Sequence, residues 1–426
     1  MRTPMLSVAW ITSLLLAGVY AGGASAATVT RGPYLQLQSP TSMTVVWLTD
    51  TACVGEVEWG ATTSYGQVKQ ATESATRHEI AITGLTPDTL YHYRVRCGGT
   101  ALTEDATFKT APLDTATAVS FSFVGDSCSA PGNATRTYNA MLPEIKNGFC
   151  ITVGDLAGRG EDNITDYWKS HFFDPVREFL KHVAMYPCLG NHELYDESSF
   201  PDYVPPVKYL ANWSLPTENS GTEVYYSFDK AHVHFASLVT FWEPYTTGSA
   251  QHTWLANDLA ATNKTWKIVY GHNAPYISQG GAASGSSVVR THLVPLFEQH
   301  DVDLYLCGHY HEYQRNMVNG VTYMLQGTGG QSLGQNSDDS QSYVQTYANN
   351  EYCFTRLDIQ GTRLLGYCRR TTGGDILDGF QLDKPPITMP WHDSFPAAGP
   401  QLNWIAPWNF TTQCGLKAQA GNPSGD

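Results

Sequence analysis

The stretch Pro187-Cys188-Leu189-Gly190-Asn191-His192-Glu193 carries an amide, an imidazole and a carboxylate on three consecutive residues. It follows a short apolar run at residues 183–185, and its glycine lets the backbone turn sharply. Side chains that bind metals or move protons are therefore gathered in a turn rather than in a core. We interpret this stretch as a functional site.

Four more polar clusters follow apolar runs elsewhere in the chain. Two lie upstream of the central stretch and two downstream, and they are Gly125-Asp126, Gly154-Asp155, Gly271-His272 and Gly308-His309-Tyr310-His311. The ends of neighbouring strands meet at one edge of a layered α/β domain, where such folds usually bind ligands. We therefore expect all five clusters to converge.

The side chains in these clusters are typical metal ligands. The candidates are Asp126, Asp155, Asn191, His272, His309 and His311. Oxygen donors mixed with imidazoles suit Fe, Zn or Mn better than Ca, which prefers nearly all oxygen. Six ligands with one shared carboxylate are enough for two metal ions roughly 3.5–4 Å apart. The sequence thus predicts a dinuclear metal centre.

Strands and helices alternate around these clusters. Strands are predicted at residues 119–124, 149–153, 223–228, 233–239, 266–270 and 303–307. Helices are predicted near residues 135–146, 167–181, 251–261 and 288–299. Such alternation, with added hairpins, indicates an α/β domain with a mixed sheet. The Gly/Ser/Gln/Asp-rich segment 327–345 is predicted to be a long loop near the site.

The N-terminal part of the chain has a different sequence pattern. Residues 29–112 contain short strands separated by turn residues, without a helical period. Residues 84–93 resemble the turn and tyrosine-bearing strand of fibronectin type III modules. We predict an all-β fibronectin III-like sandwich there, a catalytic domain at 116–385, and a C-terminal arm or truncated module at 386–426.

Composition limits the classes of function. The 426 residues carry a formal charge of −14, so no basic stripe is available for duplex nucleic acid. Arg2, an apolar run at residues 5–20 and Ala24-Ser25-Ala26 are typical of a signal peptide over residues 1–26. We expect a secreted or periplasmic protein. No later apolar run is long enough to span a membrane.

All nine cysteines follow the predicted signal peptide. Export would bring them into a compartment that permits disulfides, and an odd number leaves at least one unpaired within the chain. Cys53 with Cys97, and Cys353 with Cys368, are the predicted pairs because each flanks neighbouring strand-like runs. Sequence alone leaves the connectivity open.

The five clusters resemble the motifs of the calcineurin-like metallophosphoesterases, both in their order and in their residues. The two-domain plan is most similar to the purple acid phosphatases, over roughly residues 29–385. This resemblance implies a four-layer α/β (α+β) catalytic domain with two mixed sheets flanked by helices.

The resemblance also assigns roles by position. It implies that Asp155 bridges the two metals and that His192 faces the substrate, binding phosphate or protonating the leaving oxygen. The first metal would be held by Asp126 and His311, and the second by Asn191, His272 and His309.

Two positions depart from the family pattern. Purple acid phosphatases have a tyrosine three residues after the bridging aspartate, whereas this chain has Gly158. We therefore predict a protein that is not purple, with Fe(III) less strongly favoured. Many other family members have a histidine two residues after the first aspartate, where this chain has Cys128. Cys128 is either a thiolate ligand of the first metal or a structural residue.

Several other polar residues have simpler interpretations. His232 and His234 alternate with apolar residues, so we predict that they face outward from a strand. His171 is predicted to be a surface group on a helix. Arg315 is interpreted as a structural ion-pair partner rather than a phosphate contact.

The resemblance implies a phosphoesterase in which the bridging hydroxide attacks phosphorus in line and His192 assists the leaving group. Its substrate would be a small phosphomonoester. Arg159 and Arg315 are the few basic residues near the clusters, which favours a phosphodiesterase as the alternative. A second alternative is a non-catalytic surface-binding module with a degenerate site. The oligomeric state is not predicted.

Overall fold

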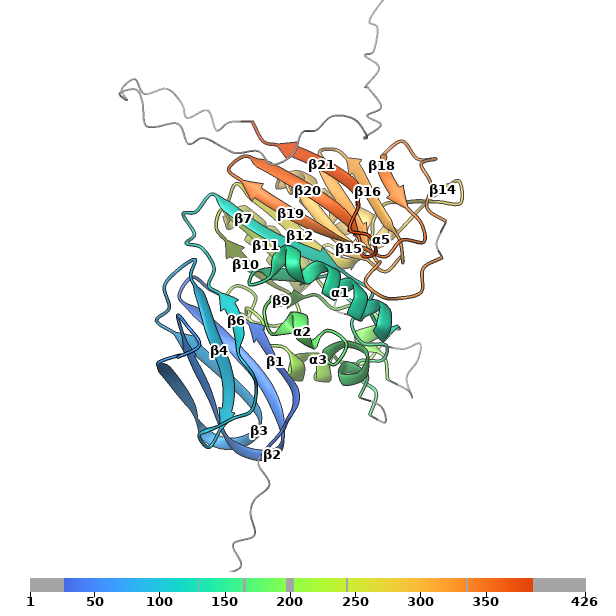
Figure 1. Cartoon of the computed structure of the whole chain (residues 1–426). Helices are drawn as coiled ribbons and strands as arrows, with labels where there is room; N and C mark the ends of the chain where they lie inside the picture. The colour runs from blue at the N-terminus through green and yellow to red at the C-terminus, as the bar shows by residue number, and fades with distance from the viewer. Residues whose placement is uncertain are drawn as a thin grey trace, which may run out of the picture. The chain divides into compact units, whose positions relative to one another are not determined.

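The computed structural model describes residues 27–128, 130–163, 166–196, 203–242, 244–334 and 336–385 (Figure 1). The predicted signal peptide and the predicted C-terminal arm lie outside these residues. Within the described part of the chain, no helix is long and apolar enough to cross a membrane.

The N-terminal part consists of strands, as predicted. They are β1 (Val29–Gln36), β2 (Ser42–Gly60), β3 (Gln67–Thr83), β4 (Leu90–Cys97), β5 (Thr100–Ala101) and β6 (Ala106–Lys109). The long strand β2 pairs with β1 along its first half and with β4 along its second, while β3 runs antiparallel beside both halves. A disulfide joins Cys53 to Cys97, which confirms the first predicted pair.

The first sheet of the region from residue 116 to residue 385 continues this N-terminal sheet. Its strands are β7 (Ala118–Val124), β8 (Phe149–Thr152), β9 (Ala184–Pro187), β19 (Cys353–Gln360), β20 (Arg363–Arg370) and β21 (Ile376–Asp383). Strands β7, β8 and β9 are parallel, and β1 pairs in parallel with β9. Strand β19 runs antiparallel to β7, so the sheet is mixed. The parallel strands β7, β8 and β9 therefore end at the same edge of this sheet.

The second sheet is also mixed. In spatial order it contains β10 (Tyr226–Lys230), β11 (Val233–Ser237), β12 (Trp266–Asn273), β15 (Leu304–Gly308), β17 (Val321–Gln326), β16 (Tyr313–Val318) and β18 (Val344–Ala348). Strands β11, β12, β15 and β17 are parallel, whereas β16 is antiparallel to β17. A separate hairpin pairs β13 (Ile277–Gln279) with β14 (Ala282–Ser284).

The two sheets share an aromatic core. Phe235 of β11 lies 5.2 Å from Phe121 of β7 and 5.6 Å from Phe149 of β8, measured between ring centroids. All three side chains are buried. Burial of a phenylalanine contributes about 1.5–3 kcal/mol, so these rings hold the two sheets together.

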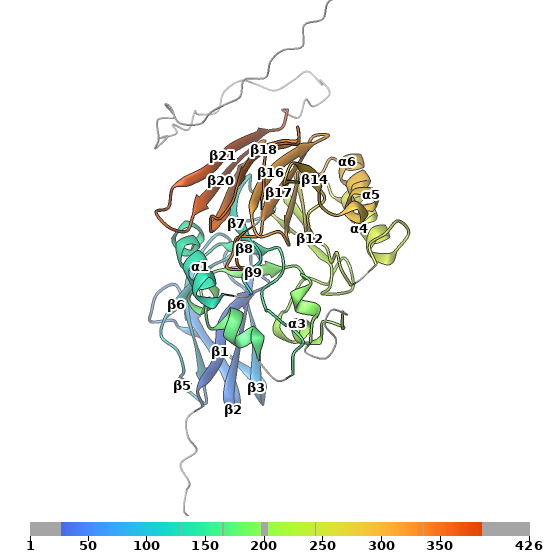
Figure 2. The ribbon, with the colours of Figure 1, turned by 90° about the vertical axis from the view of Figure 1, so that its right-hand side faces the viewer.

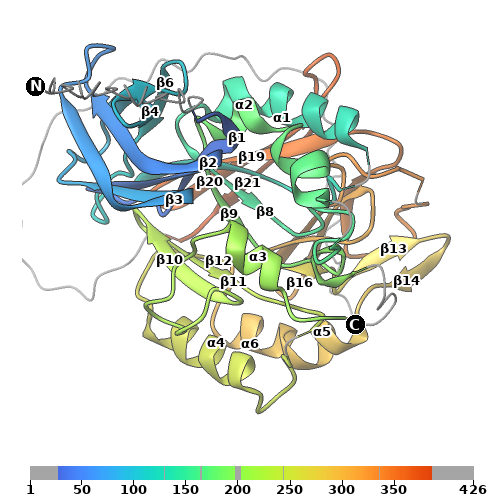
Figure 3. The ribbon, with the colours of Figure 1, turned by 90° about the horizontal axis from the view of Figure 1, so that it is seen from below.

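Helices cover the outer faces of both sheets. Figures 2 and 3 show α1 (Pro131–Ile145) on one side of the strands and α4 (Ala250–Ala261), α5 (Ser287–His292) and α6 (Val294–Gln299) on the other. The buried face of α1 packs into the core of the first sheet, and α4 to α6 pack with the strands of the second. The predicted arrangement of two mixed sheets between helices is confirmed.

Two predicted helices are each broken into two pieces. Residues 167–181 form a π-helical turn (Trp168–Phe173) and α2 (Arg177–Leu180), and residues 288–299 form α5 and α6. Pro175 and Pro295 stand at these breaks. Proline lacks the N–H that would continue the helical ladder, which explains the interruptions. A further short helix, α3 (Val207–Asn212), follows the central stretch.

The prediction that His232 and His234 face outward is wrong. Both side chains are buried. His234 lies on β11, an inner strand of a sheet covered on both faces, and His232 precedes that strand, with Nε2 3.0 Å from the Gly361 carbonyl oxygen. His234 is held between two carboxylates, with Nδ1 2.8 Å from Asp229 and Nε2 2.8 Å from Asp258. Burial opposes its protonation, but these two partners outweigh burial and raise its pKa to about 9.

The second predicted disulfide is not formed. Cys353 and Cys368 are buried, separate thiols. In the pairing of β19 with β20, Cys368 lies opposite Thr355 and Cys353 lies opposite Arg370. The two cysteines are thus diagonal neighbours rather than a directly opposed pair.

Candidate metal centre

Three of the predicted ligands sit at strand ends in an unusual backbone conformation. Asp126 follows β7, Asp155 follows β8 and His309 follows β15, with φ angles of 57°, 57° and 75°. Positive φ is uncommon for residues with a side chain, and aspartate and histidine adopt it more readily than most. The backbone N–H of His309 donates to both carboxylate oxygens of Asp126, at 3.1 and 3.0 Å. The ends of the two sheets therefore meet at one place.

Two glycines make room for the carboxylates. A Cβ at Gly190 would lie 2.2 Å from Asp155 Oδ1, and a Cβ at Gly308 would lie 2.3 Å from Asp126 Oδ2. No side chain fits at either distance. The glycines in these two clusters are thus required by the close approach of the carboxylates.

Glu193 holds the turns together, a role that the sequence analysis missed. Its buried carboxylate accepts four backbone N–H groups. The donors and distances are Gly190 (2.7 Å), Asp155 (2.8 Å), Leu156 (2.6 Å) and Ala157 (3.0 Å). One side chain therefore links the loop after β8 to the loop after β9. The sequence feature that could have indicated this role is the position of Glu193 directly after His192.

Three imidazoles are oriented by backbone carbonyl oxygens. In each, Nδ1 bonds a carbonyl oxygen, which favours the tautomer with hydrogen on Nδ1 and leaves Nε2 directed at the centre. The pairs are His272 with Val153 (2.6 Å), His192 with Gly158 (2.7 Å) and His311 with Ser332 (3.0 Å).

The remaining ring and amide atoms face one another across the centre. His272 Nε2 lies 3.2 Å from Asp155 Oδ2, and it is buried without a hydrogen-bond partner in the described part of the chain. The Oδ1 of Asn191 lies 3.1 Å from His309 Nδ1, while its Nδ2 donates to the Tyr195 hydroxyl at 3.4 Å. His311 Nε2 lies 3.6 Å from Asp126 Oδ1.

Two groups of three candidate ligands emerge, and Asp155 belongs to both. The atoms of Asp155, His272 and His309 lie within 4.8 Å of one another, as do those of Asp155, His192 and Cys128. Carboxylate, imidazole and thiol donors at this spacing suit a transition metal. The orphaned Nε2 of His272 fits the same interpretation, so the residues present can hold metal ions.

Electrostatics at the centre favour a bound cation. Burial raises the pKa of Asp126 well above its ordinary value. Burial also works to raise the pKa of Asp155, but the His272 and His192 imidazoles outweigh it and lower that pKa. Burial alone would lower the pKa of His272, whereas Asp155 and Asp126 raise it to about 10. A proton on His272 thus balances the carboxylates in the metal-free chain, in the place that a cation would take.

Gly158 and Cys128 are the two positions that depart from the family pattern, and the structure shows what surrounds each of them. A Cβ at Gly158 would lie 3.0 Å from His171 Nδ1, so the imidazole occupies the space beside residue 158. His171 is part-buried rather than a plain surface group, and burial lowers its pKa. The thiol of Cys128 is buried and accepts a hydrogen bond from Gln331 Nε2 at 3.4 Å.

The loop over residues 327–345 lies against the centre, as predicted. The N–H of Gln331 donates to the Asp126 carbonyl oxygen at 2.7 Å, and the N–H of Gly329 donates to the Gly125 carbonyl oxygen at 2.8 Å.

Arg315, on β16, binds a carboxylate outside the clusters. Its guanidinium makes a two-bonded pair with Asp378, at 2.7 and 3.1 Å, so the structural interpretation of Arg315 is confirmed.

Aromatic side chains border the centre, which the sequence analysis did not anticipate. The ring of Phe241 lies 5.4 Å from that of His272 and 5.3 Å from that of His309. Tyr203 lies 5.8 Å from Phe241 and stacks on Tyr195 at 5.5 Å. Tyr203 is exposed, so it offers an apolar surface beside the ligands.

Comparison with known proteins agrees with this geometry. Residues 120–313 match the family described as calcineurin-like phosphoesterase, and residues 30–110 match the purple acid phosphatase N-terminal domain. The chain carries both of these domains. Together with the purple acid phosphatase relatives, these two domains support a phosphatase hydrolase. The N-terminal match replaces the fibronectin III label, which fits only loosely.

Individual relatives share much of this phosphoesterase. Purple acid phosphatase 23 from Arabidopsis thaliana is 27% identical over 345 residues, covering 66% of this chain and 73% of the relative. A purple acid phosphatase structure from yellow lupin (Lupinus luteus) has a TM-score of 0.69 at 18% identity, covering 83% of this chain and 74% of that one. A structure of PhoD has a TM-score of 0.68 at 13% identity, covering 85% and 92%. These structures share the fold.

Proposed function

We propose that this chain is a secreted, dinuclear metal-dependent phosphoesterase that hydrolyses small phosphomonoesters. The observation that carries the proposal is the position of Asp155, which belongs to both groups of three candidate ligands. One shared carboxylate is what a pair of metal ions needs. The purple acid phosphatase relatives support monoesters as the substrate class.

The proposed ligand sets follow the cluster order of the family that the chain resembles, and they differ from one of the two groups of three: Asp126 and His311 take the place of His192, which is assigned to the substrate. Asp155 would bridge the two ions. Asp126 and His311 would complete the first set, with Cys128 as a further candidate, and Asn191, His272 and His309 would complete the second. Fe, Zn and Mn suit these donors, and the absence of a tyrosine at position 158 predicts a protein that is not purple. When bound, the ions would activate water and neutralise charge on the phosphoryl oxygens.

His192 is the proposed proton donor to the leaving oxygen. Its Nδ1 is fixed on the Gly158 carbonyl oxygen, so its Nε2 is free to face the substrate, 3.9 Å from Asp155 Oδ2. The side chain is 28% exposed, whereas that of Asp155 is 2% exposed. His192 can therefore reach a substrate from the open side of the centre while Asp155 stays among the ligands.

Secretion rests on two features. The N-terminal sequence is typical of a signal peptide. The Cys53–Cys97 disulfide is typical of proteins from oxidising compartments.

Phosphodiesterase activity is the alternative reaction for the same site. A monoester dianion gains from extra cationic contacts, and Arg315 offers none because Asp378 engages it in two bonds. That leaves Arg159 as the basic residue named near the clusters. A singly charged diester needs fewer such contacts.

Parallel assays on two substrates test the proposal. The mature protein is reconstituted with Fe, Zn or Mn, and its rates on p-nitrophenyl phosphate and bis(p-nitrophenyl) phosphate are compared. Faster monoester turnover is expected. Faster diester turnover would favour the alternative, and no turnover on either substrate would favour a non-catalytic binding module.

The role of Cys128 has its own readout. In the Co(II)-substituted protein, a thiolate ligand produces a sulfur-to-metal charge-transfer band in the near ultraviolet. If Cys128 binds the first metal, Cys128→Ser removes this band. An unchanged spectrum in the variant would assign Cys128 a structural role.

A further inference from the structure

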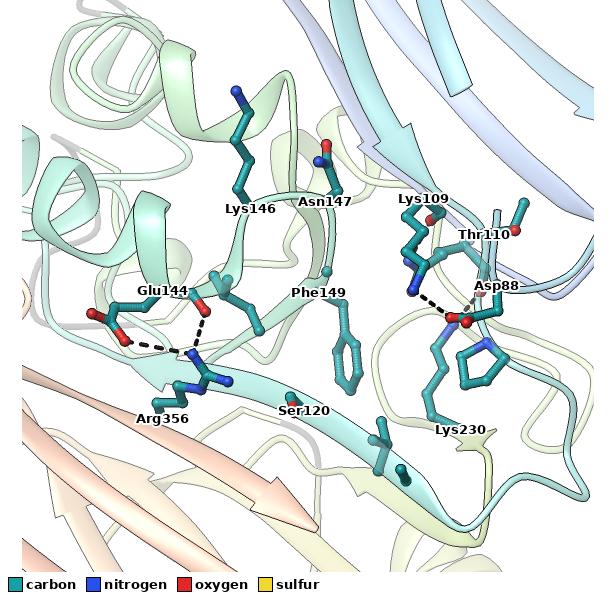
Figure 4. Close-up of a pocket in the computed structure, with 16 residues that line it drawn as sticks. Asp88, Lys109, Thr110, Ser120, Glu144, Lys146, Asn147, Phe149, Lys230 and Arg356 are labelled. Atoms are coloured by element: carbon teal, nitrogen blue, oxygen red, sulfur yellow. Dashed lines mark hydrogen bonds and ion pairs between the residues drawn. The ribbon is translucent and has the colours of Figure 1, made fainter. Parts of the chain in front are cut away.

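A cavity of about 300 Å³ lies far from the metal centre (Figure 4). Its lining residues include the first residues of β7 and β8, Ala118 and Phe149. Asp126 and Asp155 follow the opposite ends of the same strands. Strand β7 has seven residues that rise roughly 3.3 Å each, so about 20 Å separates the cavity from the catalytic edge. The cavity is therefore a separate feature, with the volume of a small-molecule pocket.

The wall of this cavity contains a buried lysine. Lys230, at the end of β10, is 4% exposed. Its ammonium donates to the Gln38 carbonyl oxygen and lies 5.1 Å from the ring centroid of Tyr186 and 5.7 Å from that of Phe149. Rings and one carbonyl stabilise a cation only in part.

Lys230 has no anionic partner in the part of the chain that the structure describes. Among the described residues, no carboxylate lies within ion-pair distance of its ammonium, and Asp114 acts on it only from farther away. Its neighbour on the hairpin, Asp229, pairs instead with His234 and Lys264. Buried charges in proteins are normally paired, so an unpaired lysine on a cavity wall calls for an anion.

The other charges of the cavity favour an anion as well. Four cationic side chains line it against two carboxylates, in a chain whose formal charge is −14. Lys109 pairs with Asp88 at 2.5 Å, and Arg356 bonds the backbone carbonyl oxygen of Glu144 at 2.8 Å and pairs with its carboxylate at 3.5 Å. Figure 4 shows these two pairs at opposite sides of the cavity, with Phe149 between them. Both carboxylates are thus already engaged, and Lys230 remains without one.

We propose that this cavity binds a small organic anion whose carboxylate or phosphate group pairs with Lys230. The aromatic ring of Phe149 and the apolar side chains of Pro112, Val119 and Ile145 would receive the body of the molecule. Ser120 and Asn147 lie at the same cavity for its polar groups. Because the N-terminal part supplies Gln38, after β1, and Lys109, on β6, the anion would connect the N-terminal part to the catalytic part.

The state of Lys230 gives the proposal a measurable signature. Burial lowers its pKa to about 7, against the opposing effect of Asp114. At pH 8 the empty cavity therefore holds mainly a neutral amine. An anion restores the charged form, so binding at pH 8 takes up a proton, whereas binding at pH 6 does not.

Isothermal titration calorimetry of the full chain with benzoate, citrate and inorganic phosphate tests the proposal. At least one probe should bind saturably, and Lys230→Met should weaken that binding about tenfold or more. Lys69→Met, on β3 and outside the cavity lining, should leave it unchanged. Asp155→Asn should also leave it unchanged, which separates this cavity from the catalytic centre.

Titrations in buffers of different ionisation enthalpy count the protons. With benzoate, which is fully ionised at both pH values, about one proton should enter per anion at pH 8 and almost none at pH 6. This count uses the unmodified chain, so it decides the question even if Lys230→Met fails to fold. Binding that survives Lys230→Met but disappears in Asp155→Asn would overturn the proposal, as would the absence of binding by all three probes or of proton uptake at pH 8.

Discussion

Replacement of Glu193 by glutamine should damage both the fold and the metal centre. The carboxylate accepts two N–H groups on each oxygen, at 2.6–3.0 Å. An amide keeps one acceptor oxygen and directs its NH₂ group at two backbone donors. Two hydrogen bonds to a charged group are lost, each contributing about 1.5–3 kcal/mol. The glutamine no longer buries a charge, which offsets a part of the lost hydrogen-bond energy. We therefore expect the free energy of unfolding to fall by about 3 kcal/mol.

The same substitution should weaken metal binding. Two of the four donors are Asp155 itself and Gly190, which precedes Asn191. Loss of such supporting bonds typically costs roughly 10–100-fold in metal affinity. The loops that carry the bridging carboxylate and the amide ligand would no longer be held at a fixed separation.

Urea denaturation of the metal-free protein, followed by circular dichroism, measures the first effect. Competition with a chromophoric chelator measures the second. Glu104→Gln, at an exposed position of the N-terminal part, is the matched control and should change neither. If Glu193→Gln unfolds within about 0.5 kcal/mol of the wild type and binds metal equally well, the reasoning about Glu193 is wrong.

Three further outcomes are expected. Asp155→Asn should lower turnover at least about a hundredfold in steady-state assays while the circular dichroism spectrum stays unchanged, because the shared carboxylate is lost; near-normal turnover would contradict the bridging role. Gly190→Ala places a Cβ 2.2 Å from Asp155 Oδ1, so metal affinity measured by chelator competition should fall about tenfold or more. Equal affinity in the variant would refute the steric argument. His234 has a folded pKa of about 9 against an ordinary 6.5, so its stabilisation of about 3 kcal/mol is complete below pH 6.5 and disappears as pH rises through 9. Urea melts of His234→Gln should lack this decline; an equal decline would assign it to other groups.

The catalytic edge could be predicted because its signals are local. Each cluster joins an apolar strand to a glycine and a polar residue, and the topology of parallel strands brings such ends together. The structure accordingly places Asp126, Asp155 and His309 at the ends of β7, β8 and β15. The Cys53–Cys97 pair was also predictable, because its residues flank neighbouring strands.

What could not be predicted depends on which face of an element is covered. His234 alternates with apolar residues like an exposed strand residue, but a second layer buries it and supplies Asp258 from α4. Cys353 and Cys368 lie on neighbouring strands, but the register offsets them. The carboxylate of Glu193 bonds a loop 36 to 38 residues away, and its position directly after His192 indicates a role at the site without indicating that distant partner.

The most direct test of the dinuclear centre is the metal content of the purified, reconstituted protein, measured by inductively coupled plasma mass spectrometry. Two metal ions per chain are expected, because two groups of ligands share Asp155. In Asp155→Asn the content should fall below two. A wild-type value near one or zero, after reconstitution with Fe, Zn and Mn in turn, would contradict the central claim.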